Sequence, residues 1–207
     1  MFDPHSLALF ALASVALIAT PGPDMVLMIV RSLGGGPRDG VLVTAGLVGG
    51  IVFHTCIVAF GLAALLAASA VAFTVVKWIG AGYLVYLGLR ALRQPVAPFE
   101  AEKDARCYRA AELLMQGFLS NALNPKVALF FFTFLPQFAD GRRAPLVLQL
   151  LLLGSLFAVM GFTSYAVLSF AVGRARTLLA TGARRVLTRT SGVIMVALGA
   201  RLALTER

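Results

Sequence analysis

The chain has 207 residues, of which 59% are apolar and 13% are charged, and its mean hydropathy is +0.89. Ordinary soluble domains carry about 45–50% apolar and about 25% charged residues, and a core this small could not bury so much apolar surface. The composition therefore excludes an ordinary soluble domain and predicts an all-α integral membrane protein. The formal charge is +9, but the basic residues lie in short gaps between apolar runs, as topology signals do. No nucleic-acid partner is expected.

Six apolar runs follow one another along the chain, each near the length of about 20 residues that a membrane-spanning helix needs. The predicted spans cover residues 6–30, 40–67, 71–92, 113–136, 145–172 and 186–204. The predicted connections are a polar stop at 31–39, a fold-back near 68–72, an aqueous loop at 94–112, a turn at 140–143 and a basic connector at 174–185. Long unbroken runs favour helices over the alternating pattern of a membrane barrel.

The sequence also gives expectations for the N-terminus, the cysteines and the orientation in the membrane. The N-terminus has neither a basic leader region nor a small-residue cleavage site, so the first span is expected to be retained. Cys56 and Cys107 fall in a span and in a polar loop, and no disulfide is expected between them. Lys and Arg number twelve in and beside the odd-numbered connections and four on the opposite side. The positive-inside rule then places both termini outside the cytoplasm.

An internal repeat divides the chain into two halves. Residues 80–90 resemble residues 191–201 at an offset of 111, and proline-centred interruptions occur at 20–24 and 124–126. The sequence predicts a single transmembrane domain over 1–207, with repeat one at about 1–93, the loop at about 94–112 and repeat two at about 113–207. An odd number of spans in each half forces the two three-helix repeats to be inverted. Inverted repeats with broken helices one and four are typical of a transporter site.

The interruptions combine proline with residues that cap helices. In the first, Thr20 is followed by Pro21, Gly22 and Pro23, and we expect Thr20 to cap a half-helix that restarts at Pro21. In the second, Asn124 is the expected cap and Pro125 the first helical residue. Each restart would leave free N–H groups and a partial positive charge, which suit a carboxylate. Simple proline kinks are the alternative.

Four titratable residues within the apolar runs are candidates for function: Asp24, His54, Lys77 and Lys126. A charge at the bilayer centre costs on the order of 2.5–3.5 kcal/mol, so such residues are functional candidates by default. Lys126 is near the middle of its span, whereas Asp24 could cap a helix at the interface and Lys77 could snorkel to the outer face. His54 could relay protons, since its side chain titrates near neutral pH, or be a hydrogen-bonded core residue.

Several chemistries lack the residues that they need. The sequence contains no P-loop, no HExxH motif and no nucleophile elbow, and its two histidines and two cysteines are scattered. We therefore expect no enzyme activity, no cofactor and no metal site.

Several segments together resemble the LysE/RhtB-type amino-acid exporters, the lysine and homoserine/threonine efflux proteins of bacteria. The segments are Thr20-Pro-Gly-Pro-Asp24, Gly46-Leu-Val-Gly-Gly50 with His54-Thr55 and Ala59-Phe-Gly-Leu62, Lys77-Trp-Ile-Gly-Ala-Gly-Tyr-Leu84, Tyr86-Leu-Gly88, Asn124-Pro-Lys126, Phe131 and Pro136-Gln-Phe138. The resemblance implies a secondary exporter of amino acids or close derivatives in the bacterial cytoplasmic (inner) membrane, driven by an ion gradient and expected to use protons.

Charge complementarity with a zwitterionic amino acid suggests roles for the candidate residues. The substrate site would comprise Thr20, Pro21, Gly22, Pro23, Asp24, Lys77, Asn124, Pro125 and Lys126. Lys126 and the half-helix N-termini would hold the α-carboxylate, Asp24 would face the α-ammonium, and Asp24 or His54 would couple transport to a proton. A membrane assembly or regulatory protein without transport activity and a small-solute channel remain alternatives. The Gly and Ala stripes of the helices allow a homodimer.

Overall fold

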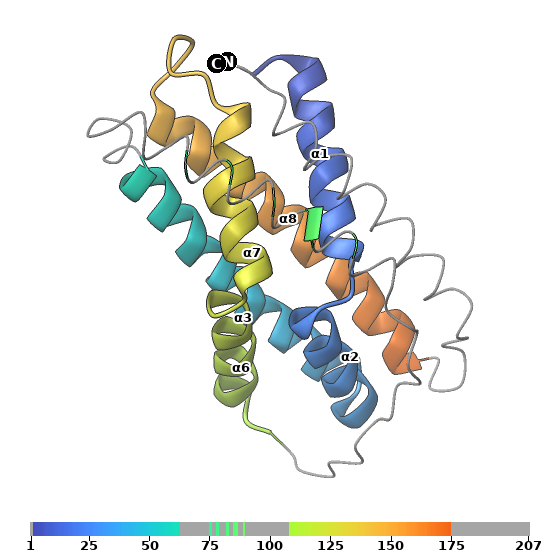
Figure 1. Ribbon diagram of the computed structural model, residues 1–207. Helices are drawn as coiled ribbons and strands as arrows, with labels where there is room; N and C mark the ends of the chain where they lie inside the picture. Colours follow the sequence, from blue (N-terminus) through green and yellow to red (C-terminus); the bar gives the residue numbers. More distant parts are fainter. Residues whose placement is uncertain are drawn as a thin grey trace.

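The computed structural model describes residues 2–62, 108–174 and six positions between them, namely 75, 78, 82, 85, 86 and 89. All regular structure in these residues is helical (Figure 1). Most of the predicted third span, including Lys77, and the whole sixth span lie outside the described residues. The described residues also leave out most of segment 80–90, all of segment 191–201 and Cys107. The six-span arrangement with two repeats therefore stays a prediction.

The first predicted span is two helices, α1 (Pro4–Ala19) and α2 (Pro23–Gly35), bent by 57° at the break. Asp3 caps α1, because its carboxylate accepts a hydrogen bond from the Ser6 backbone N–H at 3.0 Å. The helix ends because a proline keeps the residue before it out of the helical region. Thr20, before Pro21, has ψ 121°, and Gly22, before Pro23, is fully extended.

The fourth predicted span is broken in the same way. Helix α6 (Ala110–Ala122) is followed by α7 (Pro125–Leu129), with a bend of 51° between α6 and the segment Pro125–Phe138. Asn124 precedes Pro125 and is extended, at ψ 108°. The chain continues from α7 into a π-helical segment, η2 (Phe130–Phe134), and a short 3-10 helix, η3 (Leu135–Phe138).

In the part of the chain that the structure describes, two helices are long enough to cross a bilayer without a break. Helix α3 (Pro37–Cys56) runs on into the π-helical segment η1 (Ile57–Leu62), and α8 (Leu146–Arg174) has 29 residues. At 1.5 Å per residue, α8 spans about 43 Å, more than the roughly 30 Å of a hydrocarbon core. The expected polar stop at 31–39 is mostly helical. Only Gly36 separates α2 from α3, and its φ of 87° suits glycine because a side chain would be strained there.

Helix α3 lies at the centre and packs against α6, α8 and α2. Gly46 of α3 and Gly117 of α6 bring two backbones together, since a Cβ on either residue would collide with a backbone oxygen of the other helix, that of Leu114 or of Val43. One turn further along both helices, Gly50 lies against Asn121. Small residues therefore fix the register that brings α3 beside the α6–α7 break.

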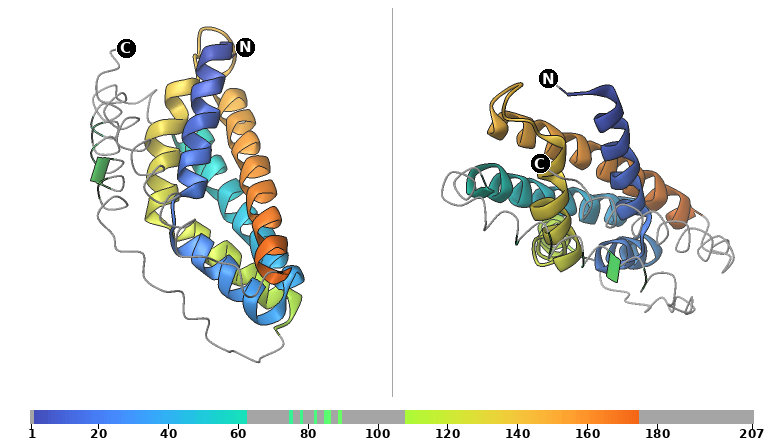
Figure 2. Two further views of the ribbon diagram at one scale, coloured as in Figure 1. Left: turned by 90° about the vertical axis from the view of Figure 1, so that its right-hand side faces the viewer. Right: turned by 45° about the horizontal axis from the view of Figure 1, so that its top comes forward.

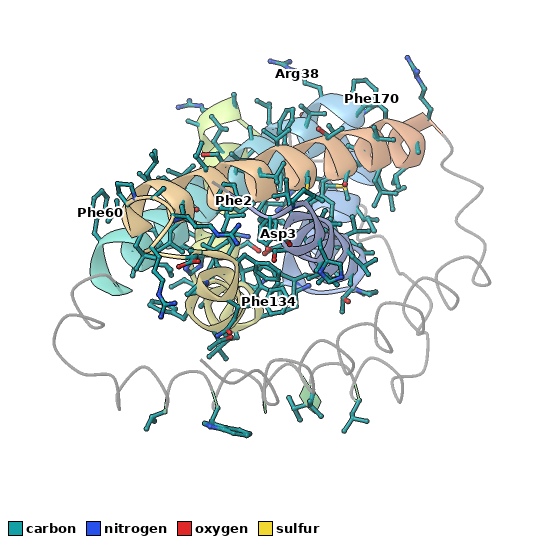
Figure 3. The ribbon with its side chains drawn as sticks, turned by 90° about the horizontal axis from the view of Figure 1, so that it is seen from above. Phe2, Asp3, Arg38, Phe60, Phe134 and Phe170 are labelled. Atoms are coloured by element: carbon teal, nitrogen blue, oxygen red, sulfur yellow. The ribbon has the colours of Figure 1, made fainter. Side chains whose placement is uncertain are left out.

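The two broken helices lie with their breaks near mid-height of the bundle. Figures 1 and 2 show α1 and α7 towards one end of the molecule and α2 and α6 towards the other. The view down the bundle in Figure 3 places Phe60 and Phe170 at its periphery, where they are 61% and 47% exposed. Exposed apolar side chains of this kind suit a lipid-facing surface, since lipid does not penalise their exposure.

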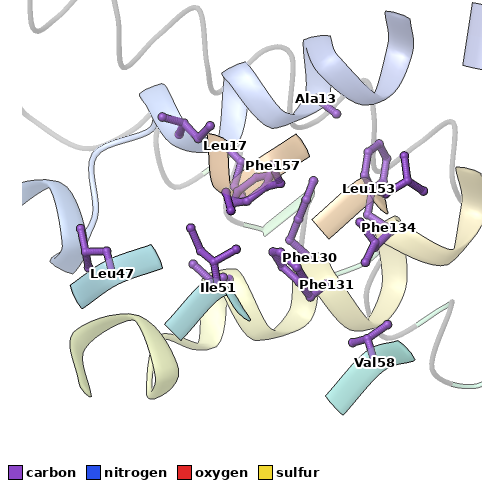
Figure 4. Packing of buried hydrophobic residues seen from close by; sticks show 14 of the residues in the cluster. Ala13, Leu17, Leu47, Ile51, Val58, Phe130, Phe131, Phe134, Leu153 and Phe157 are labelled. Carbon is purple, nitrogen blue, oxygen red and sulfur yellow. The ribbon is translucent and has the colours of Figure 1, made fainter. Parts of the chain in front are cut away.

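Aromatic rings fill the bundle at the α1 and α7 end. Phe130 and Phe131 both contact Phe157 of α8, at ring-centroid distances of 5.4 and 5.2 Å, while Phe138 contacts Phe10 of α1. Phe130, Phe131 and Phe157 are no more than 3% exposed, and they pack between the breaks and this end of the bundle (Figure 4). These rings close that end of the described helices.

Candidate functional site

The two helix breaks meet at one cavity of about 30 Å³, enough for about two water molecules. Its polar wall contains Asp24, Asn121, Lys126 and Tyr165. The apolar wall is formed mostly by aliphatic side chains of α1, α3 and α7 together with Phe157. Figure 4 shows four of these residues converging from three helices: Leu17, Leu47, Ile51 and Phe157.

Lys126 is buried, at 7% exposure, and bridges from one break to the other. It is the second residue of α7, where the positive end of the helix dipole disfavours a cation. Its Nζ donates hydrogen bonds to the carbonyl oxygens of Leu17 at 3.2 Å and Thr20 at 2.9 Å. The last carbonyls of a helix have no partner within that helix and carry partial negative charge. Lys126 therefore caps the C-terminal end of α1 from the other half of the chain.

Asp24 makes the reciprocal contact. It is the second residue of α2, where the helix dipole favours an anion, and it is 5% exposed. Its two carboxylate oxygens accept hydrogen bonds from the hydroxyl of Ser120 at 2.8 Å and the side-chain amide of Asn121 at 2.7 Å. Both donors belong to the last turn of α6. Asp24 and Lys126 thus each reach from one restarted helix to the end of the other broken helix.

The two unbroken helices contribute a second pair of contacts. Tyr165 of α8 donates from its hydroxyl to the Ile18 carbonyl at 3.0 Å, at the end of α1. His54 of α3 lies 3.1 Å from the Asn121 carbonyl through Nε2, which must carry the proton because a carbonyl oxygen only accepts. The offset from His54 to Tyr165 is 111 residues, the same as between residues 80–90 and 191–201. Each unbroken helix therefore supports the end of one broken helix.

Three buried polar atoms near the second break have no hydrogen-bond partner among the described residues: His54 Nδ1, Asn121 Oδ1 and Asn124 Nδ2. Each of these side chains is 3% exposed. Buried polar groups are nearly always paired, because an unmade hydrogen bond costs about 1–3 kcal/mol. This cluster therefore retains capacity to bind a proton or a polar group.

At the α2 and α6 end, Arg31 connects the two helices. Its Nε donates to the Gln116 side chain at 2.9 Å, and its guanidinium lies 4.0 Å from the centre of the Tyr108 ring. The polar wall of the cavity therefore lies between this connection and the aromatic rings at the other end.

Most of the residues predicted for the site lie at the two breaks. Asn124 caps α7 as expected, because its side chain accepts from the Lys126 backbone N–H at 3.0 Å, and Pro125 is the first helical residue. The capping role expected of Thr20 is wrong. Thr20 ends α1, and its hydroxyl donates back to the Ala16 carbonyl at 2.7 Å, because Pro21 holds it in an extended conformation.

The first restart therefore falls later than predicted. Helix α2 begins at Pro23, and its cap is Gly22, which has no side chain to bind the helix end. Gly22 instead gives Lys126 access to the break, since a Cβ there would lie 3.1 Å from the ammonium nitrogen. Lys77 lies outside the described residues.

The sequence-based prediction missed Ser120, Asn121 and Tyr165. Ser120 and Asn121 directly precede the predicted Asn124 cap, and two polar residues within an apolar span were the available signal. Tyr165 had a weaker signal, because a tyrosine in an apolar helix is common. The one sequence clue was its offset of 111 residues from His54, which equals the offset of the internal repeat.

The model of the LysE type translocator family matches residues 15–206, nearly the whole chain. The chain belongs to the LysE type translocator family. The resemblance found in the Thr20–Asp24 and Asn124–Lys126 segments is thereby confirmed, and these two segments form the breaks that meet at the cavity.

Curated relatives extend over most of the chain. An uncharacterised membrane protein of Bacillus subtilis (strain 168), YrhP, is 30% identical over 97% of this chain and 100% of its own length. A homoserine/homoserine lactone efflux protein of Salmonella typhimurium (strain LT2) is 31% identical over 77% of this chain and 78% of its own. A leucine efflux protein of Klebsiella pneumoniae is 29% identical over 63% and 62%. No solved structure gives a significant match.

Proposed function

We propose that this chain is a secondary active exporter of amino acids or close derivatives in the bacterial inner membrane. The observation that carries the proposal is the pair of opposite charges, Asp24 and Lys126, on the wall of one cavity between two helix breaks. An amino acid carries one charge of each sign, so a site with both signs complements it without adding net charge to the membrane interior. The efflux proteins among the relatives support the direction of transport.

The aliphatic residues opposite these charges suit a substrate with an uncharged side chain. Among the described residues, Asp24 is the single acidic side chain on the cavity wall. A substrate with a second positive charge would therefore bring a charge that no described acidic residue offsets, and its desolvation would be costly.

The placement of the cavity supports transport by alternating access. Aromatic rings close one side of it and the Arg31–Gln116 connection joins the helices on the other. The cavity has room for about two water molecules, so its walls would have to move to admit an amino acid. Rocking of one three-helix repeat against the other, about the two breaks, would open each side in turn.

Proton coupling would use Asp24 and His54, which Asn121 connects. The Asn121 side chain donates to Asp24 and its backbone carbonyl accepts from His54. His54 Nδ1, which has no partner among the described residues, is a free acceptor for a proton. A proton on His54 would add a positive charge to the network that Asn121 and Asp24 form.

The proposal is tested by efflux from proteoliposomes loaded with labelled amino acids. Wild-type protein should release at least one neutral amino acid in a saturable manner that depends on a proton gradient. Lys126→Ala and Asp24→Asn should each reduce release by more than tenfold, since each removes one half of the charge pair. Arg142→Ala provides a matched control, because Arg142 is an exposed basic residue in the turn before α8.

Three outcomes would contradict the proposal. Equal release by wild type and Lys126→Ala over a broad panel would remove the site assignment. Release without saturation or gradient dependence would indicate a channel. Loss of folded protein in both variants, with no efflux by wild type, would indicate that the charges only hold helices together.

A further inference from the structure

The Lys126 ammonium occupies a pocket formed by backbone carbonyls. Its nitrogen lies 3.2 Å from the Leu17 oxygen and 2.9 Å from the Thr20 oxygen, so two of its three N–H donors are used on the end of α1. Among the described residues it forms no ion pair, and the two oxygens of Asp24 accept from Ser120 and Asn121 instead. The carbonyls at the C-terminal end of α1 thus form a cation site in their own right.

We propose that the carbonyl oxygens of Leu17 and Thr20 bind the ammonium group of the transported amino acid, and that Lys126 occupies this position only while the substrate is absent. The inference rests on the proposed function and specifies its substrate site. The group that the carbonyls hold in the described structure, an ammonium at the end of an alkyl chain, is the same chemical group that an amino acid would present.

The location of the carbonyls supports this exchange. Leu17 and Lys126 both line the cavity, so a ligand there borders the same end of α1. Gly22 leaves the approach open, because a Cβ at this position would lie 3.1 Å from the Lys126 nitrogen. The neighbouring Ile18 carbonyl accepts from Tyr165, whereas the Leu17 and Thr20 oxygens accept from the Lys126 ammonium.

The exchange balances charge without a proton or a covalent step. The substrate ammonium takes the two carbonyls, and the released Lys126 ammonium pairs with the substrate carboxylate. Asp24 keeps its bonds to Ser120 and Asn121. The site therefore selects compounds with a free primary ammonium beside a carboxylate, and it rejects N-acylated amino acids and 2-hydroxy acids.

The experiment removes the internal ammonium and supplies an external one. Truncation of Lys126 to alanine deletes three carbons and the nitrogen, which is the composition of propylammonium. Propylammonium at ten times its dissociation constant should raise the Tm of the purified full-length Lys126→Ala protein by about 3–6 °C. Propylammonium should not change the Tm of wild type, because Lys126 already fills the site. Tetramethylammonium has no N–H donor and should change the Tm of neither protein.

Each other result contradicts the assignment. An equal shift in wild type and Lys126→Ala, or no shift in either, would show that the carbonyls are not an exchangeable ammonium site. A shift that Asp24→Asn abolishes in the double variant would assign the ammonium to Asp24 instead. If Lys126→Ala does not fold alone, its folded yield from cells grown with propylamine is measured. Rescue by propylammonium but not tetramethylammonium supports the proposal, and no rescue overturns it.

This result does not depend on transport. Failure of the proposed function would appear as a wild-type protein that releases no amino acid from proteoliposomes, whatever propylammonium does. Failure of the inference alone would appear as normal efflux by wild type, together with N-acetylated substrate competing as well as the free amino acid.

Discussion

Asp24 and Lys126 occupy the same position in two helix restarts, each as the second residue of a helix that begins with proline. The helix dipole stabilises Asp24 there and destabilises Lys126. The imbalance is offset by their partners, because Asp24 binds side-chain donors from the end of α6 while Lys126 binds backbone carbonyls at the end of α1. Each break is thus stabilised by a charge from the other, and removal of one charge should loosen both.

Gly22→Ala should displace Lys126 and reduce efflux. Gly22 has φ −165° and ψ −179°, an extended backbone that alanine also adopts, so the effect comes from the new Cβ beside the ammonium. Loss of one hydrogen bond to a charged group costs about 1.5–3 kcal/mol, and we expect efflux to fall about tenfold or more. Gly141→Ala is the control, because a Cβ there meets nothing within 4 Å. Equal efflux by the two variants would contradict the close approach of Lys126.

Tyr165→Phe should destabilise the protein by about 1–3 kcal/mol, because it leaves the buried Ile18 carbonyl without its donor. Urea unfolding in detergent measures the difference. Ser155→Ala on the same helix removes an exposed hydroxyl that donates to the Leu151 carbonyl, and it should change stability by less than about 0.5 kcal/mol. A Tyr165→Phe protein as stable as the Ser155→Ala protein would show that the α1 end needs no donor from α8.

Gly46→Ala should destabilise the contact between α3 and α6 by about 1–3 kcal/mol, since its Cβ would overlap the Leu114 carbonyl oxygen. Gly61→Ala in η1 is the matched control, because a Cβ there meets nothing within 4 Å. Alanine favours helix over glycine at both positions, so the difference between the variants isolates the packing. Thermal unfolding of both would decide, and a Gly46→Ala protein as stable as Gly61→Ala would contradict the register of α3 on α6.

Asp3 should make stability depend on pH in the acid range. Hydrogen bonding from the Ser6 backbone holds the pKa of the Asp3 carboxylate below its ordinary value of 3.8. A lowered pKa in the folded state contributes stability above 3.8, which is lost as the pH falls through the folded-state value. Asp3→Asn keeps a capping side chain but cannot titrate. Its Tm should therefore fall less than that of wild type between pH 5 and pH 3, and parallel curves would contradict the cap.

Much of this architecture is readable from proline and charge. Pro21, Pro23 and Pro125 lack an N–H donor and restrict the residue before them, so the breaks follow from local sterics. The exact start of α2 does not, because Thr20 can cap the following helix or bond back to its own, and the choice depends on Pro21. The sequence also did not predict that 31–39 is mostly helical, because a charged stretch suggests a loop. A single residue, Gly36, is enough to turn the chain there.

The partners of the site residues depend on contacts that no single segment encodes. Lys126 is identifiable as a functional candidate because a buried lysine is costly. Its bonds to Leu17 and Thr20 are not identifiable, since carbonyls exist at every position and the choice among them is made by the packing of α1 against α8 and η3. The partner of Tyr165 is likewise not identifiable from the sequence, because its hydroxyl finds the Ile18 carbonyl only when the end of α1 packs beside it.

The one-residue connection at Gly36 determines which pieces of the chain travel as a unit. Helices α2 and α3 are joined too tightly to drift apart, whereas three residues separate α1 from α2. Displacement of the N-terminal end of α3 must therefore displace the C-terminal end of α2 with it. Gly36 is thus the shortest linker between two helices in the described chain. Inserted glycines would lengthen it and let the joined ends of α2 and α3 move independently.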